Sequence, residues 1–192
     1  TDHQSLPSEY NPRQRFWTVR TKHIILATGA IERPIAFGNN DRPGVMSVTA
    51  AHTYLNRFAI LPGKKIIICT NNDSAYLPAL ELSEAGADVK LLDARSGIED
   101  SLSEKALRKG VDLQMNAAPL NVNGSRGVKS LDIALEKKNK WQRGNTELCD
   151  LILVSGGWSP VVHLLSHRGI RPIWDKQNAC FVPNKYSEPI TV

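Results

Sequence analysis

The sequence predicts an α/β fold in which a small domain with a parallel sheet is inserted into a second, larger domain. A strand, a turn, a helix, a glycine and another strand follow one another between residues 65 and 93. Two further apolar runs, residues 23–29 and 150–156, flank this segment and resemble each other: a polar residue, four apolar residues, a hydroxyl residue and a glycine. With 192 residues, the chain is long enough for one small domain plus parts of a neighbour.

The composition is that of a folded globular protein, with 41% hydrophobic and 22% charged residues. The sequence contains no run of about 18 apolar residues, so no membrane span is expected. The basic residues behind the net charge of +5 are dispersed and no nucleic-acid-binding module accompanies them, which favours a solvated surface over a nucleic-acid partner. The first residues carry neither an initiator Met nor a signal pattern, so we expect a piece of a longer protein.

The three cysteines, Cys69, Cys149 and Cys180, lie far apart in the sequence and form no C-x-x-C pair. An odd count argues against a disulfide framework, so a reducing cytoplasm is expected. Cys69 and Cys149 lie in or beside apolar runs, which predicts buried, inert thiols. The histidines show no metal-ligand spacing with the cysteines, and no metal site is expected.

The segment before the insert is expected to belong mostly to the larger domain. Residues 1–14 are polar, contain two prolines and predict a loose end. We assign residues 15–61 to the larger domain, with a strand at 15–20 and a buried parallel strand at 22–29, where an apolar run ends at a glycine. Apolar residues at helical spacing then predict a helix over 47–60, beginning at a Ser or Thr cap.

The inserted domain is expected to span residues 62–148. It begins with the βαβ unit, a Rossmann-like element whose right-handed crossover makes its two strands parallel. The βαβ unit consists of strands at 65–69 and 87–93 and a helix at 74–85. Strands at 111–115 and 128–135 and a helix at 101–109 are expected after it. Residues 149–192 open with the last apolar strand and are expected to return into the larger domain.

The turn of the βαβ unit is the first candidate site. Dinucleotide sites usually have G-x-G-x-x-G here, because glycine lets the backbone approach the pyrophosphate and a helix N-terminus attracts anions. This turn, residues 70–75, is Thr-Asn-Asn-Asp-Ser-Ala and has no glycine. One interpretation is a nucleotide turn in which the side chains of Asn71, Asn72 and Ser74 replace glycine N–H groups. The alternative is a shell that keeps the fold and has lost the ligand, since Asp73 repels a phosphate.

Asp93 ends the second strand of the unit, roughly 20 residues after the turn. An acid at this place can accept hydrogen bonds from the adenosine ribose, which favours NAD over NADP. Arg95 would instead favour a phosphate, and many βαβ units end a strand in Asp without binding any ligand. Asp93 is therefore a weaker candidate than a complete motif would be.

Two further strand ends are candidates, Thr28-Gly29 and Gly156-Gly157. Open α/β sheets bind ligands at the carboxyl ends of their strands, and small residues there let a flat cofactor approach the backbone. The alternative is an ordinary turn from strand to loop. Trp158 is expected to fill a domain interface rather than to stack on a ring.

No catalytic group is predicted. The sequence contains no G-x-S-x-G elbow, no H-E-x-x-H motif and no redox C-x-x-C motif. His52 and His163 are each predicted on helices among apolar neighbours, which favours packed or surface histidines over general bases.

Four stretches together resemble one family. They are residues 27–34, 39–46, 70–76 and 155–164, with the sequences ATGAIERP, NNDRPGVM, TNNDSAY and SGGWSPVVHL. The order and the sequences of these stretches closely resemble those of the alpha subunit of heterotetrameric sarcosine oxidase, and the resemblance extends over about residues 16–182. Related amine and opine oxidases and hydrogen cyanide synthase subunits share the first and last stretches more loosely.

The resemblance implies a thioredoxin-reductase-like core, in which one FAD/NAD(P)-binding domain of Rossmann type is inserted into another. It implies a whole enzyme that oxidatively demethylates sarcosine with oxygen, giving glycine, hydrogen peroxide and formaldehyde or methylene-tetrahydrofolate. It also implies that this subunit binds NAD without turning it over and that FAD and FMN belong to the complex. The implied partners are the beta, gamma and delta subunits, and tetrahydrofolate on a C-terminal domain outside this chain.

The resemblance also implies two groups of cofactor-binding residues. The group lining the dinucleotide of the larger domain is Thr28, Gly29, Gly156 and Gly157. The group at the turn and strand end of the inserted domain is Asn71, Asn72, Ser74 and Asp93. The function expected is a cofactor-binding and scaffold piece of an oxidoreductase that acts on a CH–NH group, inactive by itself. The alternatives are a non-catalytic Rossmann-like interaction scaffold, part of a related amine or opine oxidase or proline dehydrogenase subunit, or a complete small NAD-dependent reductase.

Overall fold

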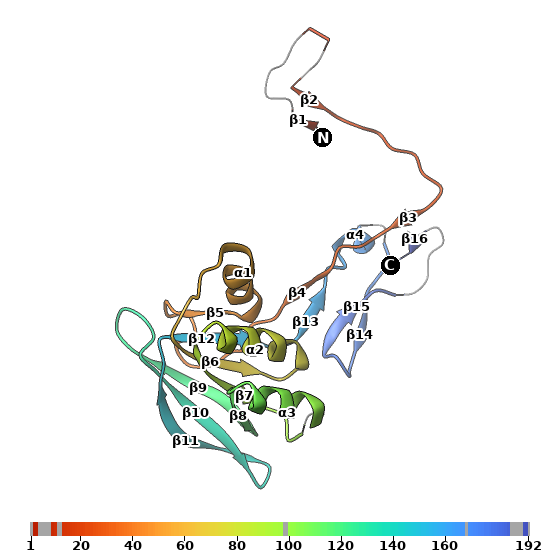
Figure 1. Cartoon of the computed structure of the whole chain (residues 1–192). Coiled ribbons are helices and arrows are strands. Elements are labelled where there is room, and N and C mark those ends of the chain that lie inside the picture. The colour runs from red at the N-terminus through yellow and green to blue at the C-terminus, as the bar shows by residue number, and fades with distance from the viewer. Residues whose placement is uncertain are drawn as a thin grey trace.

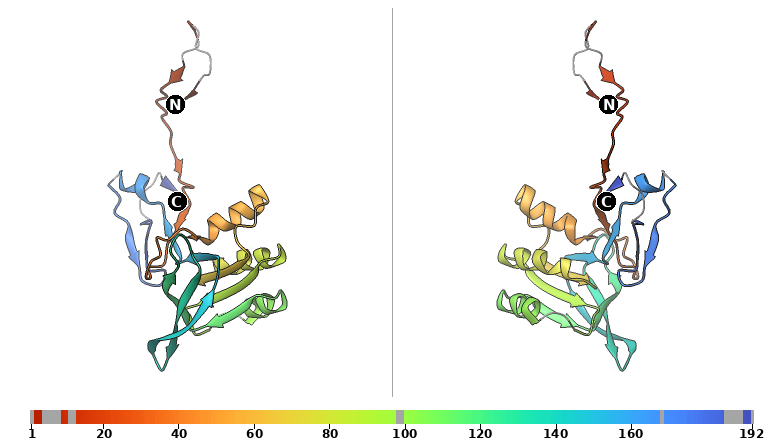
Figure 2. Two further views of the ribbon diagram at one scale, coloured as in Figure 1. Left: turned by 90° about the vertical axis from the view of Figure 1, so that its left-hand side faces the viewer. Right: turned by 90° about the vertical axis from the view of Figure 1, so that its right-hand side faces the viewer.

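A computed structural model of the chain gives its fold (Figure 1). The structure describes residues 2–3, 9–10, 13–97, 100–167, 169–184 and 190–191. The main body has three layers, with a five-stranded parallel sheet in the middle, helices on one face and a three-stranded antiparallel sheet on the other (Figure 2). No helix among the described residues is long and apolar enough to cross a membrane.

The βαβ unit forms as the sequence predicts. Strand β6 (Lys65–Thr70) leads through a single 3₁₀ turn, η1 (Asp73–Ala75), into helix α2 (Tyr76–Glu84). Strand β7 (Asp88–Asp93) then pairs with β6 in parallel, from Lys65 beside Asp88 to Thr70 beside Asp93. Gly86, with φ of 98°, lies in the left-handed conformation that ends the helix.

The parallel sheet has the strand order β5-β12-β6-β7-β8. Strand β8 (Asp112–Met115) follows β7, whereas β12 (Leu151–Ser155) and β5 (Val45–Ser47) extend the sheet on the other side of β6. The sheet therefore extends beyond residues 62–148, the range expected for the inserted domain. All five residues of β12 are buried, and a strand that is apolar on both faces is stabilised at the centre of a covered sheet.

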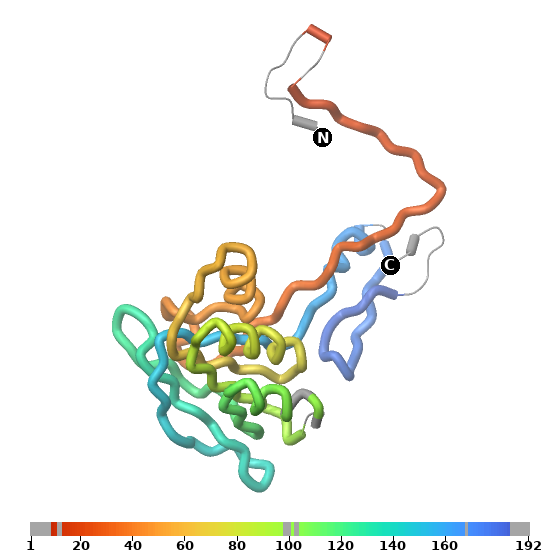
Figure 3. Tube along the Cα trace, viewed as in Figure 1, coloured from red at the N-terminus to blue at the C-terminus, as the bar shows by residue number. Residues whose placement is uncertain are grey.

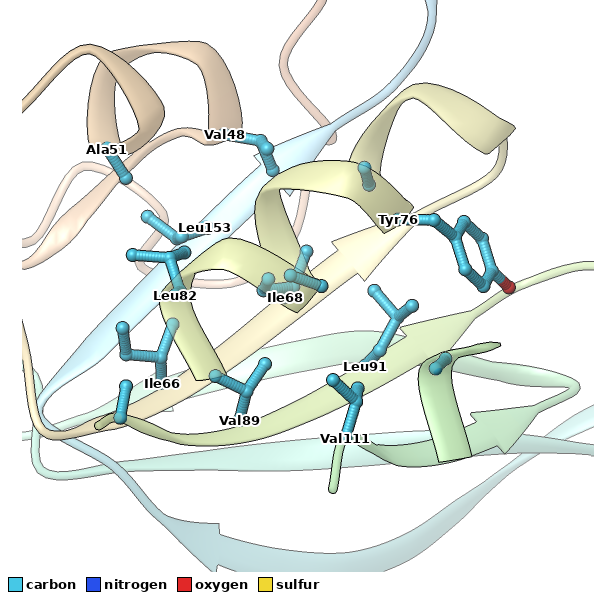
Figure 4. Close-up of a cluster of buried hydrophobic side chains, with 14 of the residues drawn as sticks. Val48, Ala51, Ile66, Ile68, Tyr76, Leu82, Val89, Leu91, Val111 and Leu153 are labelled. Atoms are coloured by element: carbon cyan, nitrogen blue, oxygen red, sulfur yellow. The ribbon is translucent and has the colours of Figure 1, made fainter. Parts of the chain in front are cut away.

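Helices α1 (Val48–Phe58), α2 and α3 (Asp100–Arg108) cover one face of this sheet. The Oγ atom of Ser47 accepts a hydrogen bond of 3.2 Å from the N–H of Ala50 and so caps α1, as predicted. The helix stops at Phe58 because Ala59 takes the left-handed conformation, with φ of 52°. Figure 4 shows the core between these layers, which includes Val48, Ile66, Ile68, Tyr76, Leu82, Val89, Leu91 and Leu153.

The other face is covered by β9 (Ala117–Asn123), β10 (Ser130–Lys137) and β11 (Lys140–Leu148), in the order β11-β10-β9. Only β10 was expected from the sequence. A second core lies between the two sheets and includes Ile67, Cys69, Leu92, Leu131, Ile133, Cys149, Ile152 and Val154. The predicted burial of the thiols of Cys69 and Cys149 is thus confirmed, at the interface of two sheets.

Two neighbouring crossings connect the main body to the rest of the chain. Strand β4 (Ala30–Glu32) leads in and β13 (Trp158–Pro160) leads out, and the two pair antiparallel. The run at 22–29 before β4 is not the buried strand that its pattern predicts. Its strand β3 (Ile24–Ile25) pairs with β16 (Ile190–Thr191). Within the described part of the chain this short strand is its one partner, and Ile25 stays 79% exposed.

The strand expected at 15–20 does not form either. Strand β2 (Gln14–Arg15) pairs with β1 (Asp2–His3), and residues 16–20 are irregular. Figure 3 shows this segment leading away from the main body. Phe16 is 90% exposed, so its ring contributes little to any core of the described chain.

After β13 the chain forms the short helix α4 (His163–Ser166) and a hairpin of β14 (Ile173–Asp175) and β15 (Cys180–Val182). The rings of Trp174 and Phe181 meet edge to face across this hairpin, with centroids 5.1 Å apart. Strand β15 contacts β13, which brings the turn of the hairpin close to the carboxyl edge of the parallel sheet.

Candidate functional site

The carboxyl ends of β6, β7 and β12 meet at one edge of the sheet and gather most of the predicted site residues. Because parallel strands end on the same side, Thr70 lies beside both Asp93 and Ser155. Thr28 and Gly29 are not part of this edge. They lie on the incoming crossing, where the Thr28 hydroxyl donates to the carbonyl of Val161 (2.8 Å).

Asn72 organises the turn after β6. Its side-chain oxygen accepts the backbone N–H of Ser74 (3.1 Å) and also the Ser74 hydroxyl, while its amide donates to the carbonyl of Ser155 (3.0 Å). Asn72 is extended, with φ of −153°, and none of residues 71–73 has a positive φ. The turn therefore works through side-chain hydrogen bonds and does not use the left-handed backbone that glycine usually supplies.

Side chains of the chain itself occupy the place where a phosphate would bind at the start of the helix. The N–H of Ser74 is already bonded to Asn72, and the carboxylate of Asp73 lies in the first turn of η1. A phosphate at a helix N-terminus depends on free N–H groups and on the absence of competing negative charge. In this conformation the Ser74 N–H is not free and Asp73 adds a negative charge, so the turn is a poor site for a phosphate.

Asp93 is fully buried, and both of its carboxylate oxygens are occupied. The hydroxyl of Tyr76 donates to Oδ2 (2.8 Å), and the backbone N–H of Arg95 donates to Oδ1 (2.9 Å). The guanidinium of Arg95 adds a bond from Nε to Oδ1 (3.0 Å) and one from a terminal nitrogen to Oδ2 (2.7 Å). A ribose hydroxyl would have to displace one of these donors to reach Asp93.

Arg95 also connects the turn to the end of β7. A second terminal nitrogen of its guanidinium lies 2.7 Å from Oδ1 of Asp73. The hydrogen bond to Asp93 raises the pKa of Arg95, so its charge is permanent. Burial, followed by the bond to Asp93, raises the pKa of the Tyr76 hydroxyl and keeps it a donor. The four side chains form a closed set, which we call the Asp93 cluster: Asp73, Tyr76, Asp93 and Arg95.

Gly156 and Gly157 are required by the path of the chain itself. A Cβ at Gly156 would lie 2.9 Å from the carbonyl oxygens of Arg33 and Pro34. A Cβ at Gly157, where φ is 95°, would lie 2.5 Å from the guanidinium of Arg33. The backbone of Arg33 and Pro34 in the incoming crossing therefore occupies the space beside Gly156 in which a flat cofactor was expected.

A pocket of about 390 Å³ opens between this edge and the turn of the β14–β15 hairpin. Three predicted site residues, Asn71, Asn72 and Gly157, line it together with Arg33, Trp158, Pro160, Val182 and residues 177–180. Trp158 lies at this pocket, and its indole N–H donates to the Ser74 hydroxyl (3.1 Å). Sequence reasoning missed Arg33 and the hairpin, although Arg33 belongs to the ATGAIERP stretch.

His52 and the thiols of Cys69 and Cys149 show no sign of reactivity. Nε2 of His52 lies 2.7 Å from Glu81 and also contacts Asn56, so this histidine joins α1 to α2. Burial raises the pKa of Cys149 to about 12, and burial raises the pKa of Cys69 as well. Among the described residues, no group of three or more His, Cys, Asp or Glu is arranged to hold a metal ion.

Comparison with known proteins places this site in context. Residues 10–186 match the family model described as pyridine nucleotide-disulphide oxidoreductase. The chain is 39% identical over 178 residues to a sarcosine oxidase subunit alpha of Corynebacterium sp. (strain U-96), covering 89% of this chain and 18% of that subunit. It is 37% identical to the subunit of the same name from Rhizobium meliloti (strain 1021), covering 94% of this chain and 17% of that subunit. The chain thus spans less than a fifth of the length of these relatives.

The fold also matches a solved structure. The thioredoxin reductase of T. acidophilum superposes with a TM-score of 0.63 at 14% identity, over 83% of this chain and 56% of that one. The thioredoxin-reductase-like α/β arrangement expected from the sequence is confirmed by this match.

Proposed function

Because the chain belongs to the pyridine nucleotide-disulphide oxidoreductase family, we propose that it forms the dinucleotide-domain region of an alpha-type subunit in a sarcosine oxidase-like enzyme. Its own part is to hold NAD and to position the surrounding chain, without breaking bonds in the amine substrate. The identity of 37–39% to sarcosine oxidase alpha subunits over about nine tenths of the chain supports the kind of enzyme.

The observation that carries the binding role is the pocket beside Asn71, Asn72 and Gly157. Its volume of about 390 Å³ lies within the range of small-molecule sites, which is about 300–1,000 Å³. The side-chain amide of Asn71 suits a carboxamide or ribose hydroxyls, and the indole of Trp158 offers a flat surface. Asn72 holds the turn through Ser74 and Ser155 and shapes the pocket wall. A pyridine nucleotide supplies a hydride-accepting ring when bound. The residues of the pocket fit its nicotinamide half, whereas the saturated Asp93 does not fit its adenosine ribose.

The site proposed for the larger domain's dinucleotide rests on Thr28 and Gly29. A Cβ at Gly29 would meet no atom within 4 Å, and the backbone there has φ of 70°. Open space beside a left-handed glycine suits the close approach of a cofactor. We therefore keep Thr28 and Gly29 as proposed ligand neighbours, while the incoming crossing accounts for Gly156.

For the whole enzyme we propose oxidative demethylation of sarcosine to glycine with production of hydrogen peroxide. FAD and FMN would serve the complex, and the partners would be beta, gamma and delta subunits and tetrahydrofolate.

We propose a cytoplasmic enzyme. We propose that the chain is inactive by itself, because amine oxidation would take place at a flavin held elsewhere in the complex. Peroxide production from sarcosine by the isolated chain would contradict this part of the proposal.

The binding role is tested by titrating the full chain with NAD in a calorimeter. Asn71→Leu removes an amide from the pocket and is expected to weaken NAD binding about tenfold, the value of one good hydrogen bond. Asn145→Leu is the matched control, because Asn145 is exposed on β11 and does not line the pocket. Equal dissociation constants for the two variants, or no heat with NAD, would contradict the proposal.

The second candidate is a non-catalytic Rossmann-like interaction scaffold. The Asp93 cluster favours it, since Asp73 in the turn and Asp93 at the end of β7 are both bound to Arg95 and not left for a ligand. A ligand that binds only the folded state raises the unfolding temperature. An unfolding temperature that millimolar NAD leaves unchanged would support the scaffold, and a clear rise would support the NAD-binding role.

A further inference from the structure

Arg33 is the one charged side chain among the described residues that line the pocket. Its two terminal guanidinium nitrogens donate to the carbonyl oxygens of Ala179 and Asn178, the second bond measuring 3.1 Å. Carbonyl oxygens satisfy N–H groups but carry no net charge. Among the described residues Arg33 forms no ion pair, so its positive charge is not neutralised within this part of the chain.

The guanidinium has donors to spare. It carries five N–H groups, and the two bonds to the hairpin use only two of them. The Nε atom is buried and has no hydrogen-bond partner among the described residues. A buried donor without a partner is unfavourable, and a charged donor is satisfied best by an anionic acceptor.

The position of Arg33 is fixed from both sides. Backbone bonds of 2.8 Å run from the N–H of Arg33 to the carbonyl of Gly157 and from the N–H of Gly156 to the carbonyl of Arg33. On the other side Asp175 shapes the hairpin turn by accepting the N–H of Gln177 (2.8 Å) and the side-chain amide of Asn178 (2.7 Å). Asp175 is thus engaged with the turn and does not line the pocket.

We propose that Arg33 makes this pocket an oxyanion site, which takes a phosphate or carboxylate group of a ligand held beside Trp158. Among the described residues, the lining supports an anion because it contains one guanidinium, the side-chain amides of Asn71 and Gln177, and no carboxylate. The amides of Asn72 and Asn178 already donate to Ser155 and Asp175. The dinucleotide version of this inference rests on the proposed function, since the pyrophosphate of NAD would then be the oxyanion. A small amino acid would bring a carboxylate to the same guanidinium.

The test is calorimetric titration of the full chain and its Arg33→Met variant with four probes: NAD, inorganic pyrophosphate, nicotinamide riboside and sarcosine. We expect Arg33→Met to raise the dissociation constants of NAD and pyrophosphate at least about tenfold, which is the usual effect of losing one charge-assisted hydrogen bond. The riboside, which is a cation without a phosphate, should bind Arg33→Met at least as well as the unmodified chain. Arg171→Met is the matched control, because it removes the same charge from an exposed position outside the pocket.

Each result decides between specific alternatives. Sarcosine binding that depends on Arg33, without any pyrophosphate binding, would support the oxyanion site and identify the anion as a carboxylate. Arg33-dependent pyrophosphate binding without NAD binding would keep the oxyanion site and refute the proposed NAD role. All anions binding Arg33→Met within twofold of the unmodified chain would overturn the inference.

A further variant separates charge from folding. Arg33→Lys keeps the charge and is expected to retain more affinity for pyrophosphate than Arg33→Met. Equal losses in both variants, accompanied by an equal fall in unfolding temperature and by weaker riboside binding, would mean that Arg33 only holds the hairpin. That outcome would also overturn the oxyanion site.

Discussion

Replacing Arg95 with Met tests whether Asp93 belongs to the fold or is a free acceptor for a ligand. The substitution leaves a fully buried carboxylate without its guanidinium, while the Tyr76 hydroxyl and one backbone N–H remain as donors. Removing one partner of a buried ion pair costs about 3–5 kcal/mol, because the other charge stays buried and unpaired. The Arg95 side chain is 30% exposed, so we expect the lower end of this range, about 3 kcal/mol.

Two comparison variants assign this loss to the buried charge. Asp73→Asn breaks only the outer pair, whose carboxylate is 60% exposed, and should cost about 0–1 kcal/mol. The double variant Arg95→Met/Asp93→Asn removes the unpaired charge and should recover much of the stability lost by Arg95→Met alone.

The assay is urea denaturation at neutral pH, with the free energy of unfolding extrapolated to water for each variant. An equal slope across the variants shows that the native and denatured states stay comparable. A loss below about 1 kcal/mol for Arg95→Met would refute the reasoning, and so would a double variant as unstable as the single one. The first result would mean that Asp93 tolerates being unpaired, as a ligand acceptor must. The second would mean that the loss comes from other contacts of the Arg95 side chain and not from the buried charge.

Three further predictions concern other parts of the chain. Gly156→Ala places a Cβ against two backbone carbonyls of the incoming crossing and should lower the free energy of unfolding by about 1–3 kcal/mol; an unchanged unfolding temperature would contradict this. The hydrogen bond from Thr146 holds the pKa of the buried Asp132 below its usual 3.8, so this carboxylate stabilises the fold above about pH 4 and loses that effect as the pH falls further. Asp132→Asn should therefore flatten the dependence of the urea midpoint on pH below about 4, and a profile as steep as before would speak against it. The thiols of Cys69 and Cys149 should react with a disulfide reagent at pH 8 only after unfolding, because burial raises both pKa values; rapid labelling of the native chain would disprove their inertness.

Local sequence patterns were sufficient to predict the βαβ unit and helix α1. The strand Lys65–Thr70 is a short apolar run. Helix α1 has apolar residues at helical spacing and begins at the Ser47 cap, so neighbours in the sequence determine both elements. Strands β9 and β11 were not predictable in this way. Pro119 interrupts the pattern of β9, and most side chains of β11 are exposed, so neither strand shows a clear alternation.

The candidate site depends on contacts between residues distant in the sequence. The sequence indicated Asn72 and Asp93, but not that Asp93 would already be saturated, since this depends on how Arg95 folds back and on Tyr76 from α2. Arg33 lies more than 100 residues from the hairpin that it binds, and a sequence pattern does not report such a pairing.

The antiparallel pairing of β4 with β13 puts the entrance and the exit of the main body next to each other, with Ala30 beside Pro160 and Glu32 beside Trp158. For any chain that continues on either side, residues 33–157 therefore behave as a single loop whose ends are already closed. The entropy of closing a loop grows only with the logarithm of its length, and here the folded strands fix the ends. Such a unit can be acquired, lost or exchanged as one block during evolution while the host chain keeps its path.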